Sequence, residues 1–593
     1  MKRPSQTFPI REKVHGPTGR ASRSLFIAGL SGLVLLLLFD FITIGRQASW
    51  QDEIFFVSTG WSLAQSKPPI MSVMEQYPQT DSPIQFYGPV SFEVDAQLIR
   101  VLGLSLVAWR FLCLVGVILT LLLSSSLVKL AGGDRWAQLI TALIIGLAQS
   151  VNNNLPGRFD AVATALFLSG LLLLLRGADV GGRATLWGAI LGGAFIGVAL
   201  GSTPRSLTLS LAAAISALLT AVGFRKVRKQ FLFGTAAMFV IAVSVQTLLL
   251  LPWGMNSLSW YAYVRQATKG DTINATSVVG LGTLDFELHW HKATFLVLLL
   301  LMLTGLLGAL AQRGRDTNRE KIALKFFLTV FAAVNLFLML LLLAQALGQS
   351  PYWLTPVVIG VMCWFDWKIL KAKALGSIVA GLVGTCLAVL VIQNAENIVS
   401  VFLTWNRRNN ADLTRFVKRT VEPGAVVYGP VSGYFYPVEL AGAKYLYLSE
   451  QARAGRLSEP GVSIADKLEE EVCAHSTYTM WPETNPLHHS EGEPMPQALR
   501  ERLLPRLAEL SQPHLSTWKE ELLDHLAPIA GKYGFPDVAI YPLKSLGHCG
   551  KVETLREEHR WDLPRLYLHR TAPSRSGYVT MGLSTTMRGV GAS

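Results

Sequence analysis

The chain has 593 residues, of which 51% are hydrophobic and only 16% charged, and its mean hydropathy is +0.37. The apolar residues are concentrated in long runs, so the composition excludes an ordinary soluble enzyme. A net charge of +13 could indicate a nucleic-acid partner. However, many basic residues fall in short gaps between apolar runs, as they do in the cytoplasmic loops of membrane proteins. We therefore expect a membrane protein that does not bind nucleic acid.

A basic segment, residues 1–23, precedes the first apolar run at Ser24–Ile44. That run is longer than the apolar part of a signal peptide, which is about 7–15 residues, and no clear cleavage site of small residues follows it. We interpret the run as a retained transmembrane helix and the basic segment as a cytoplasmic tail.

About eleven apolar runs approach the length of about 20 residues that crosses a bilayer. They are Ser24–Ile44, Leu104–Val128, Trp136–Val151, Phe159–Leu175, Ala184–Gly201, Ser206–Gly223, Phe231–Leu251, Lys292–Ala311, Leu324–Leu347, Tyr352–Phe365 and Leu375–Gln393. The predicted fold is therefore a polytopic α-helical membrane domain over residues 24–395. Glycines within the runs, such as Gly192, Gly193, Gly381 and Gly384, would let helices approach closely.

Basic residues occupy every second gap between these runs. They are Lys129, Arg135, Arg176, Arg183, Arg225, Lys226, Arg228, Lys229, Arg313, Arg315, Arg319, Lys321, Lys325, Lys368, Lys371 and Lys373. Because cytoplasmic loops are enriched in Lys and Arg, the alternation predicts a cytoplasmic N-terminus. An odd number of spans then places the region from about residue 396 outside the cytoplasm.

Two adjacent carboxylates, Asp52 and Glu53, follow the first span and open a long predicted outer loop, residues 46–97. Acidic residues so close to a membrane are costly unless they are solvated or functional. A second interpretation is structural, because Ser49 and Asp52 have the spacing of a helix N-cap and its acidic partner. The short interfacial helix begun there would lay an apolar side on the membrane. That side would consist of Ile54, Phe55, Trp61 and Leu63.

Two further predicted outer segments carry polar residues, namely 152–160 and the loop 252–291. The cations near the outer face run against the expected charge bias, and as a set they indicate an anion site. They are Arg46, Lys67, Arg158, Arg205, Arg265, Lys269 and Lys292. For any one of them, contact with lipid headgroups is the alternative. His289 and His291 alternate as metal ligands on a strand can, but a solvated loop is the simpler interpretation.

The region 396–571 has a different composition and predicts a compact extracytoplasmic α/β domain, followed by a disordered tail over 572–593. Its expected strands are Ala425–Gly429, Tyr445–Leu448, Val538–Tyr541 and Arg565–His569. Its expected helices are Asp412–Val421, Ile464–Cys473, Gln497–Leu510 and Thr517–Ile529.

The five cysteines fall into two groups. Cys113, Cys363 and Cys386 lie in apolar runs and are expected to be inert core residues. Cys473 and Cys549 lie in the predicted extracytoplasmic domain, where they could pair, although sequence alone leaves their separation open.

A basic tail, one span and an outer loop that opens on Asp52-Glu53 resemble the GT-C membrane glycosyltransferases. The resemblance is greatest to the protein-mannosyltransferase and aminoarabinose-transferase type of bacterial inner membranes. The residues that carry it are Tyr87-Gly88-Pro89, Leu102-Gly103-Leu104-Ser105, Trp109-Arg110-Phe111 and Gly157-Arg158-Phe159-Asp160. The similarity covers residues 20–370 approximately and does not extend to the C-terminal domain.

The resemblance implies transfer of a sugar from a polyprenyl-phosphate carrier to an acceptor on the outer face, which could be a lipid, a glycan or a protein. It implies a catalytic role for Asp52, with Glu53 beside it. A carboxylate there could act as general base, and cations could hold the phosphate of the leaving group. The candidate substrate-binding residues are Lys67, Arg158, Asp160, Arg205, Arg265 and Lys269.

The competing hypothesis is a membrane transporter or lipid flippase. Transporters carry charges near the middle of the bilayer and internal repeats. Here the apolar runs are nearly free of Asp and Glu and no repeat is evident, which favours the enzyme. No sequence pattern requires a cofactor, and dependence on a divalent metal stays open.

Overall fold

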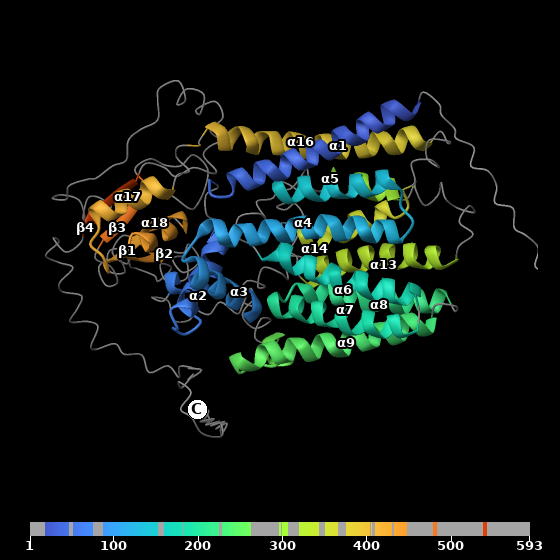
Figure 1. Ribbon diagram of the computed structural model, residues 1–593, viewed down its shortest axis with the longest axis horizontal. Helices are drawn as coiled ribbons and strands as arrows, with labels where there is room; N and C mark the ends of the chain where they lie inside the picture. Colours follow the sequence, from blue (N-terminus) through green and yellow to red (C-terminus); the bar gives the residue numbers. More distant parts are fainter. Residues whose placement is uncertain are drawn as a thin grey trace, which may run out of the picture.

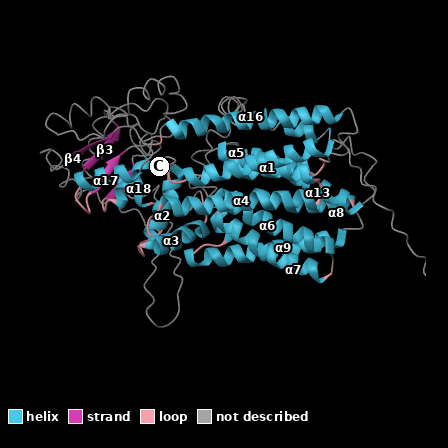
Figure 2. Ribbon diagram, turned by 45° about the horizontal axis from the view of Figure 1, so that its top comes forward, coloured by secondary structure: helices cyan, strands magenta, loops and turns pink. Residues whose placement is uncertain are grey.

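The computed structural model describes residues 18–46, 51–74, 87–151, 159–180, 182–224, 228–261, 296–297, 299–305, 307, 319–342, 350–365, 375–403, 405, 410–429, 432–447, 478–482 and 538–542. Long helices lie roughly side by side in a bundle, and the strands are confined to one end of it (Figures 1 and 2). We call the end of the bundle beside the strands the domain end, and the opposite end the far end.

The bundle contains ten helices within the described residues. They are α1 (Thr18–Thr43), α4 (Leu106–Leu130), α5 (Arg135–Val151), α6 (Asp160–Val180), α7 (Arg183–Ser202), α8 (Ser206–Gly223), α9 (Arg228–Leu250), α13 (Arg319–Leu342), α14 (Ser350–Met362) and α16 (Leu375–Leu403). Residues 299–305 are helical as well. Each of the ten coincides with a predicted apolar run, and α1 begins six residues before its run, inside the predicted tail.

Seven of these helices contain a segment long and apolar enough to cross a membrane. Those segments lie in α1, α4, α6, α7, α8, α9 and α13. By contrast, α5 has only 17 residues, and the apolar parts of α14 and α16 are shorter than a full span. The membrane character of the chain is therefore confirmed, whereas the predicted number of eleven spans stays a prediction.

Small residues bring three neighbouring helices close together. A Cβ added at Gly192 of α7 would meet the carbonyl oxygen of Gly170 on α6 at 2.6 Å, and one at Gly193 would meet that of Met238 on α9 at 2.7 Å. Such close backbone approach is what small residues provide in membranes. No described atom lies within 4 Å of a Cβ built at Gly381 or Gly384 of α16, so the expectation stays a prediction at these two positions.

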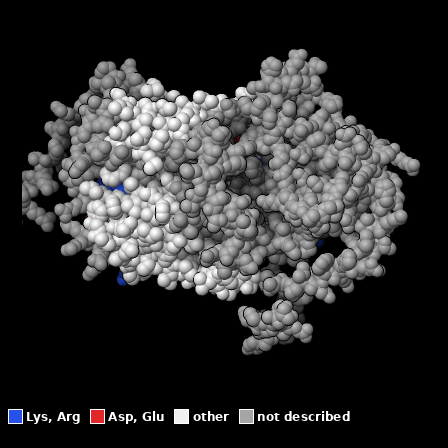
Figure 3. Space-filling model, turned by 180° about the vertical axis from the view of Figure 1, so that it is seen from behind, with Lys and Arg blue, Asp and Glu red and all other residues white. Residues whose placement is uncertain are grey.

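Basic side chains mark the far end of the bundle. Lys129 lies in the last turn of α4, Arg135 begins α5, and Lys321 lies in the first turn of α13, close to Gly132. Most of the described surface on the face seen in Figure 3 is neither acidic nor basic, as expected for helices that contact lipid. The uncharged surface supports a membrane protein, and the orientation with the far end in the cytoplasm stays a prediction.

Two short helices and a turn lie at the domain end of the bundle, where an outer loop was predicted. They are α2 (Gln51–Ala64), η1 (Ser72–Met74) and α3 (Pro89–Leu102). The alternative in which a short helix begins near Asp52 is therefore confirmed, whereas the place of residues 46–97 outside the membrane stays a prediction. The idea that α2 lays an apolar side on the membrane is wrong, because Ile54 and Leu63 are buried in the protein and Phe55 packs on its C-terminal part.

The C-terminal part contains α17 (Asn410–Thr420), β1 (Val426–Gly429), η7 (Ser432–Tyr434), α18 (Phe435–Leu440), β2 (Lys444–Tyr447), β3 (Tyr478–Pro482) and β4 (Val538–Pro542). The strand order is β2-β1-β3-β4, with β4 antiparallel to β3 and the other pairs parallel. Three strands and α17 were predicted, whereas β3 and α18 were not. The other expected strand and helices lie outside the described residues, as do Cys473 and Cys549.

The three described cysteines, Cys113, Cys363 and Cys386, are buried and free. This confirms the expectation that they are core residues of the helical part.

Candidate functional site

Asp160 is the centre of a buried polar cluster at the domain end of the bundle. The hydroxyl groups of Tyr87 and Tyr352 both donate to its Oδ1 atom, at 2.6 and 2.8 Å. Arg205 Nη1 lies 3.5 Å from the same oxygen and donates to the Tyr87 hydroxyl at 3.2 Å. The Asp160 side chain is fully buried, whereas that of Arg205 is 16% exposed. The cluster therefore holds a guanidinium group at the boundary between the buried interior and the surface.

Four segments far apart in the chain bring this cluster together. Asp160 lies in the first turn of α6, where the helix dipole favours a negative charge. Arg205 precedes α8, and Tyr352 lies in the first turn of α14. Tyr87 is held by its neighbour Gly88, whose backbone N–H donates to the carbonyl of Ser202 at 2.7 Å. A Cβ at Gly88 would overlap the carbonyl oxygen of Gly201, so only glycine fits there.

A second cluster fixes α2 to the bundle. Arg110 of α4 donates to both carboxylate oxygens of Glu53, at 2.8 and 2.7 Å. It also donates to the backbone carbonyl of Ile44, at the end of α1, at 2.8 Å. Both side chains of the ion pair are buried, at 1% and 0% exposure. Bidentate pairing of this kind sets geometry as well as energy, so it holds α1, α2 and α4 in one arrangement.

Asp52 lies in the first turn of α2, immediately before Glu53. The structure describes the backbone at this position but not the side chain. Because neighbouring helical residues point about 100° apart, positions 52 and 53 are on different faces of α2. Position 52 shares its face with Phe55, three residues on, which packs against Tyr447 of the C-terminal part with ring centroids 6.0 Å apart.

Asp95 of α3 is a third buried carboxylate near the same helix. It is 1% exposed, and neither of its oxygens has a hydrogen-bond partner among the described residues. Its carboxyl group packs on Gly60 of α2, where a Cβ would overlap it. Burial raises the pKa of Asp95 well above its ordinary value, and the negative charge of Glu53 raises it further. We infer that Asp95 keeps its proton in the folded protein.

This protonation makes the stability of the protein depend on pH. Above the ordinary pKa of 3.8 an unfolded chain loses the Asp95 proton while the folded protein retains it. Stability should therefore fall as pH rises from about 3.8 through the raised folded pKa. Asp95→Asn mimics the neutral acid, so it should remove this decline and raise the melting temperature at neutral pH. Thermal unfolding in detergent across acidic to neutral pH checks this, and an unchanged slope in the variant would contradict it.

The structure does not place the remaining predicted site residues at the Asp160 cluster. Arg158, Arg265 and Lys269 are outside the described residues, as are Lys292, His289 and His291. Lys67 is exposed and acts electrostatically on Glu439, so it is not part of the Asp160 cluster. Arg46 stacks on Trp405, 5.0 Å from the ring centroid. In the described part of the chain, no group of three or more His, Cys, Asp or Glu residues is arranged to hold a metal ion.

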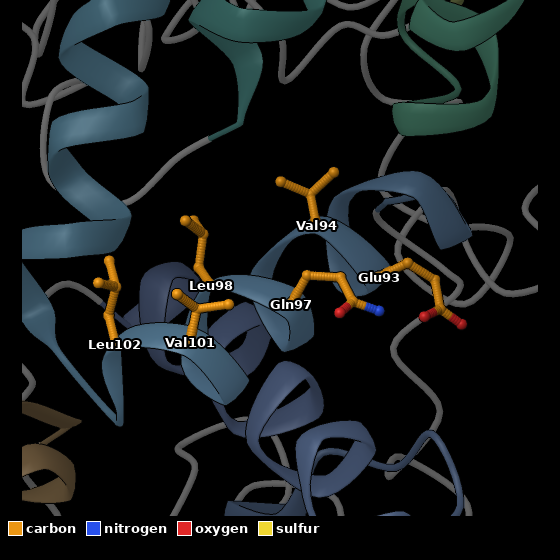
Figure 4. Close-up of a pocket in the computed structure, with 6 residues that line it drawn as sticks. All are labelled: Glu93, Val94, Gln97, Leu98, Val101 and Leu102. Atoms are coloured by element: carbon orange, nitrogen blue, oxygen red, sulfur yellow. The ribbon is translucent and has the colours of Figure 1, made fainter.

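A shallow groove runs along the outer side of α3, as Figure 4 shows. It is lined by Glu93, Val94, Gln97, Leu98, Val101 and Leu102. All six come from one helix. The buried Asp95 belongs to the other side of α3, so the groove is separate from the polar clusters.

The sequence did not predict the two tyrosines of the cluster or the roles of Arg110 and Asp95. Tyr87 and Arg110 are inside the motifs that carried the family resemblance, and this was the available signal for them. Tyr352 gave no signal, since it begins an apolar run like several others. Asp95 lies near the end of the predicted outer loop 46–97, and no feature of the sequence distinguished it there.

Neither a scan of protein-family models nor a search of curated proteins gives a match. Solved structures do match at low similarity. ArnT from Cupriavidus metallidurans bound to undecaprenyl phosphate is 13% identical, with 89% of this chain and 98% of that chain covered and a TM-score of 0.38. The archaeal oligosaccharyltransferase AglB from Archaeoglobus fulgidus, in complex with an inhibitory peptide and a dolichol-phosphate, is 13% identical. The match covers 77% of this chain and 69% of that chain, with a TM-score of 0.45.

A third structure, the arabinofuranosyltransferase AftD from Mycobacteria, is 12% identical, with 88% of this chain but only 41% of that chain covered and a TM-score of 0.45. At such low identities and TM-scores, these likenesses do not assign a function. The function is therefore inferred from the residues of this chain.

Proposed function

We propose that this protein is a membrane glycosyltransferase that moves a sugar from a polyprenyl-phosphate carrier to an acceptor at the outer face of the membrane. The observation that carries the proposal is the Asp160–Tyr87–Tyr352–Arg205 cluster. It lies at the end of an apolar bundle, where the headgroup of a membrane lipid would lie, and it presents a fixed guanidinium at the surface. Its position opposite the basic far end supports an outer-face site.

In this proposal Arg205 holds the phosphate of the lipid carrier. A guanidinium can form two parallel hydrogen bonds to phosphate oxygens, and it remains charged at all relevant pH values. Asp160 does not touch substrate. It orients Arg205 directly and through the Tyr87 hydroxyl, so that the cation is in place before the lipid arrives. Preorganised charge of this kind stabilises the negative charge that the phosphate gains as it leaves.

Asp52 is the proposed general base. In the reaction the bond between the anomeric carbon and the phosphate oxygen breaks, and the phosphate keeps the electron pair. The acceptor oxygen or nitrogen forms the new bond to the anomeric carbon and gives its proton to Asp52. Both carboxylate oxygens of Glu53 accept from Arg110, so Glu53 supports the helix that carries Asp52. This differs from the expectation that Glu53 takes part in catalysis beside Asp52.

Replacement of Arg205 tests the proposal. Arg205→Ala should weaken use of the lipid donor by about 1.5–3 kcal/mol, the worth of a hydrogen bond to a charged group. This corresponds to a kcat/KM for the donor lowered roughly 10- to 150-fold. The measurement is sugar transfer in membranes as a function of donor concentration. Lys129→Ala, at the far end of the bundle, is the control and should leave kcat/KM unchanged. Equal effects from the two variants would count against the site.

A further inference from the structure

One face of α18 in the C-terminal part meets α2 at two points. The carboxylate of Glu439 accepts a hydrogen bond from Trp61 Nε1 of α2 at 3.1 Å. Its second oxygen accepts from the backbone N–H of Tyr445 in β2 at 3.0 Å. One carboxylate thus joins α2 directly to the sheet. In the chain, α18 connects β1 to β2, and its residues are part of the hydrophobic core of the C-terminal part.

The second point is Tyr436, three residues before Glu439 and therefore on the same face of α18. Tyr436 is fully buried, and its hydroxyl has no hydrogen-bond partner among the described residues. It lies within electrostatic reach of Glu53, Arg110 and Asp95. Burial, together with the nearby negative charge of Glu53, raises the pKa of Tyr436 well above its ordinary value, so the phenol stays neutral. Hence the buried Tyr436 of α18 lies near the ion pair that anchors the start of α2.

Apolar contacts extend this interface towards position 52. Phe55 packs against Tyr447 at the end of β2. Residues of α2, α3, α18 and the strands belong to one continuous hydrophobic core, which includes Ile54, Phe92, Tyr436 and Tyr445. The C-terminal part is therefore not an appendage joined by a linker. It is packed against the helix whose first turn contains Asp52.

We propose that the C-terminal part is a working component of the active site, and that Glu439 is a positioning residue that holds α2, and with it Asp52, in register with the bundle. This inference rests on the proposed transferase function. A catalytic group displaced by about 1 Å can cost about 10²-fold in rate, so a hydrogen bond at the far end of a helix of 14 residues can matter to catalysis.

The test uses two substitutions that keep the shape of the interface. Glu439→Gln removes the charge and one acceptor, and Trp61→Phe keeps an aromatic ring but removes the donor N–H. Glu422→Gln, an exposed acidic residue of the same C-terminal part, is the control. Two quantities are measured on the full-length protein, namely hydrogen exchange of the amides in residues 51–64 and the transfer rate at saturating and limiting donor.

We expect both variants to speed exchange in α2 but not in α4 or α6, and to lower kcat by about 10- to 10²-fold with little change in KM. A purely structural loss would speed exchange in all three helices. Unchanged exchange in α2, or faster exchange with normal kcat, would overturn the inference. If the wild-type protein shows no transfer at all while the variants still speed exchange in α2, the contact of α18 with α2 is confirmed and the proposed transferase function is wrong.

Discussion

Asp52→Asn is expected to lower turnover by about 10²–10⁴-fold, the usual contribution of a general base. The substitution keeps the size of the side chain and most of its hydrogen bonding, but it removes the negative charge and the basicity. If Asp52 only supports the start of α2, the change should cost about 1 kcal/mol of stability or less and leave turnover nearly intact. The measurement is transfer of labelled sugar from the lipid donor in membranes, normalised to folded protein.

The matched control for Asp52→Asn lies outside the proposed machinery. Gln51→Glu, in the same turn of α2, alters the charge at the start of the helix without removing the proposed base. It should leave turnover within a small factor of the wild type. Near-normal turnover in Asp52→Asn would show that Asp52 only supports the start of α2, and the proposed mechanism would then lack its general base.

Arg110→Met is expected to lower the free energy of unfolding by about 3–5 kcal/mol, because it leaves the buried carboxylate of Glu53 without its partner. The variant also loses the hydrogen bond to the Ile44 carbonyl at the end of α1. Chemical unfolding in detergent, followed by a spectroscopic signal from the helices, measures the loss.

A double variant separates the ion pair from simple loss of volume. Glu53→Leu combined with Arg110→Met replaces the buried pair by apolar side chains, a change that is often neutral or stabilising. We expect it to recover much of the stability lost in Arg110→Met. If the double variant is as unstable as the sum of the two single ones, the two residues are not energetically coupled, and the anchoring role given to the pair is wrong.

The helical bundle could be predicted from the sequence because membrane helices are specified by local composition. An apolar run such as Leu104–Val128 has few alternatives to a helix, since the bilayer leaves no water to satisfy a bare backbone. The helix α3 was missed, and the apolar side of α2 was wrongly assigned to the membrane, for the opposite reason. Their apolar residues, including Ile54 and Phe92, face the protein rather than lipid, so their runs are short and interrupted by polar positions.

Individual residues of the site could be predicted from the sequence, but the contacts between them could not. Asp160 and Arg205 were both candidates, but the link through Tyr87 and Tyr352 was not foreseen, because Tyr352 is 192 positions from Asp160. The partner of Glu53 lies 57 positions away in Arg110. Pairings of this kind depend on how helices pack, and the local sequence around either partner does not contain that information. The contact of Trp61 with Glu439, across 378 positions, is the extreme case.

We propose that the domain end of the bundle transfers a sugar and releases polyprenyl phosphate. The most direct measurement uses purified protein in liposomes that contain a polyprenyl-phosphate sugar labelled in the sugar, together with an extract of membrane acceptors. We predict that the label leaves the carrier and appears on an acceptor, with an equal amount of polyprenyl phosphate released. If the label instead stays on its carrier and crosses the bilayer, the protein is a lipid transporter and the claim is contradicted.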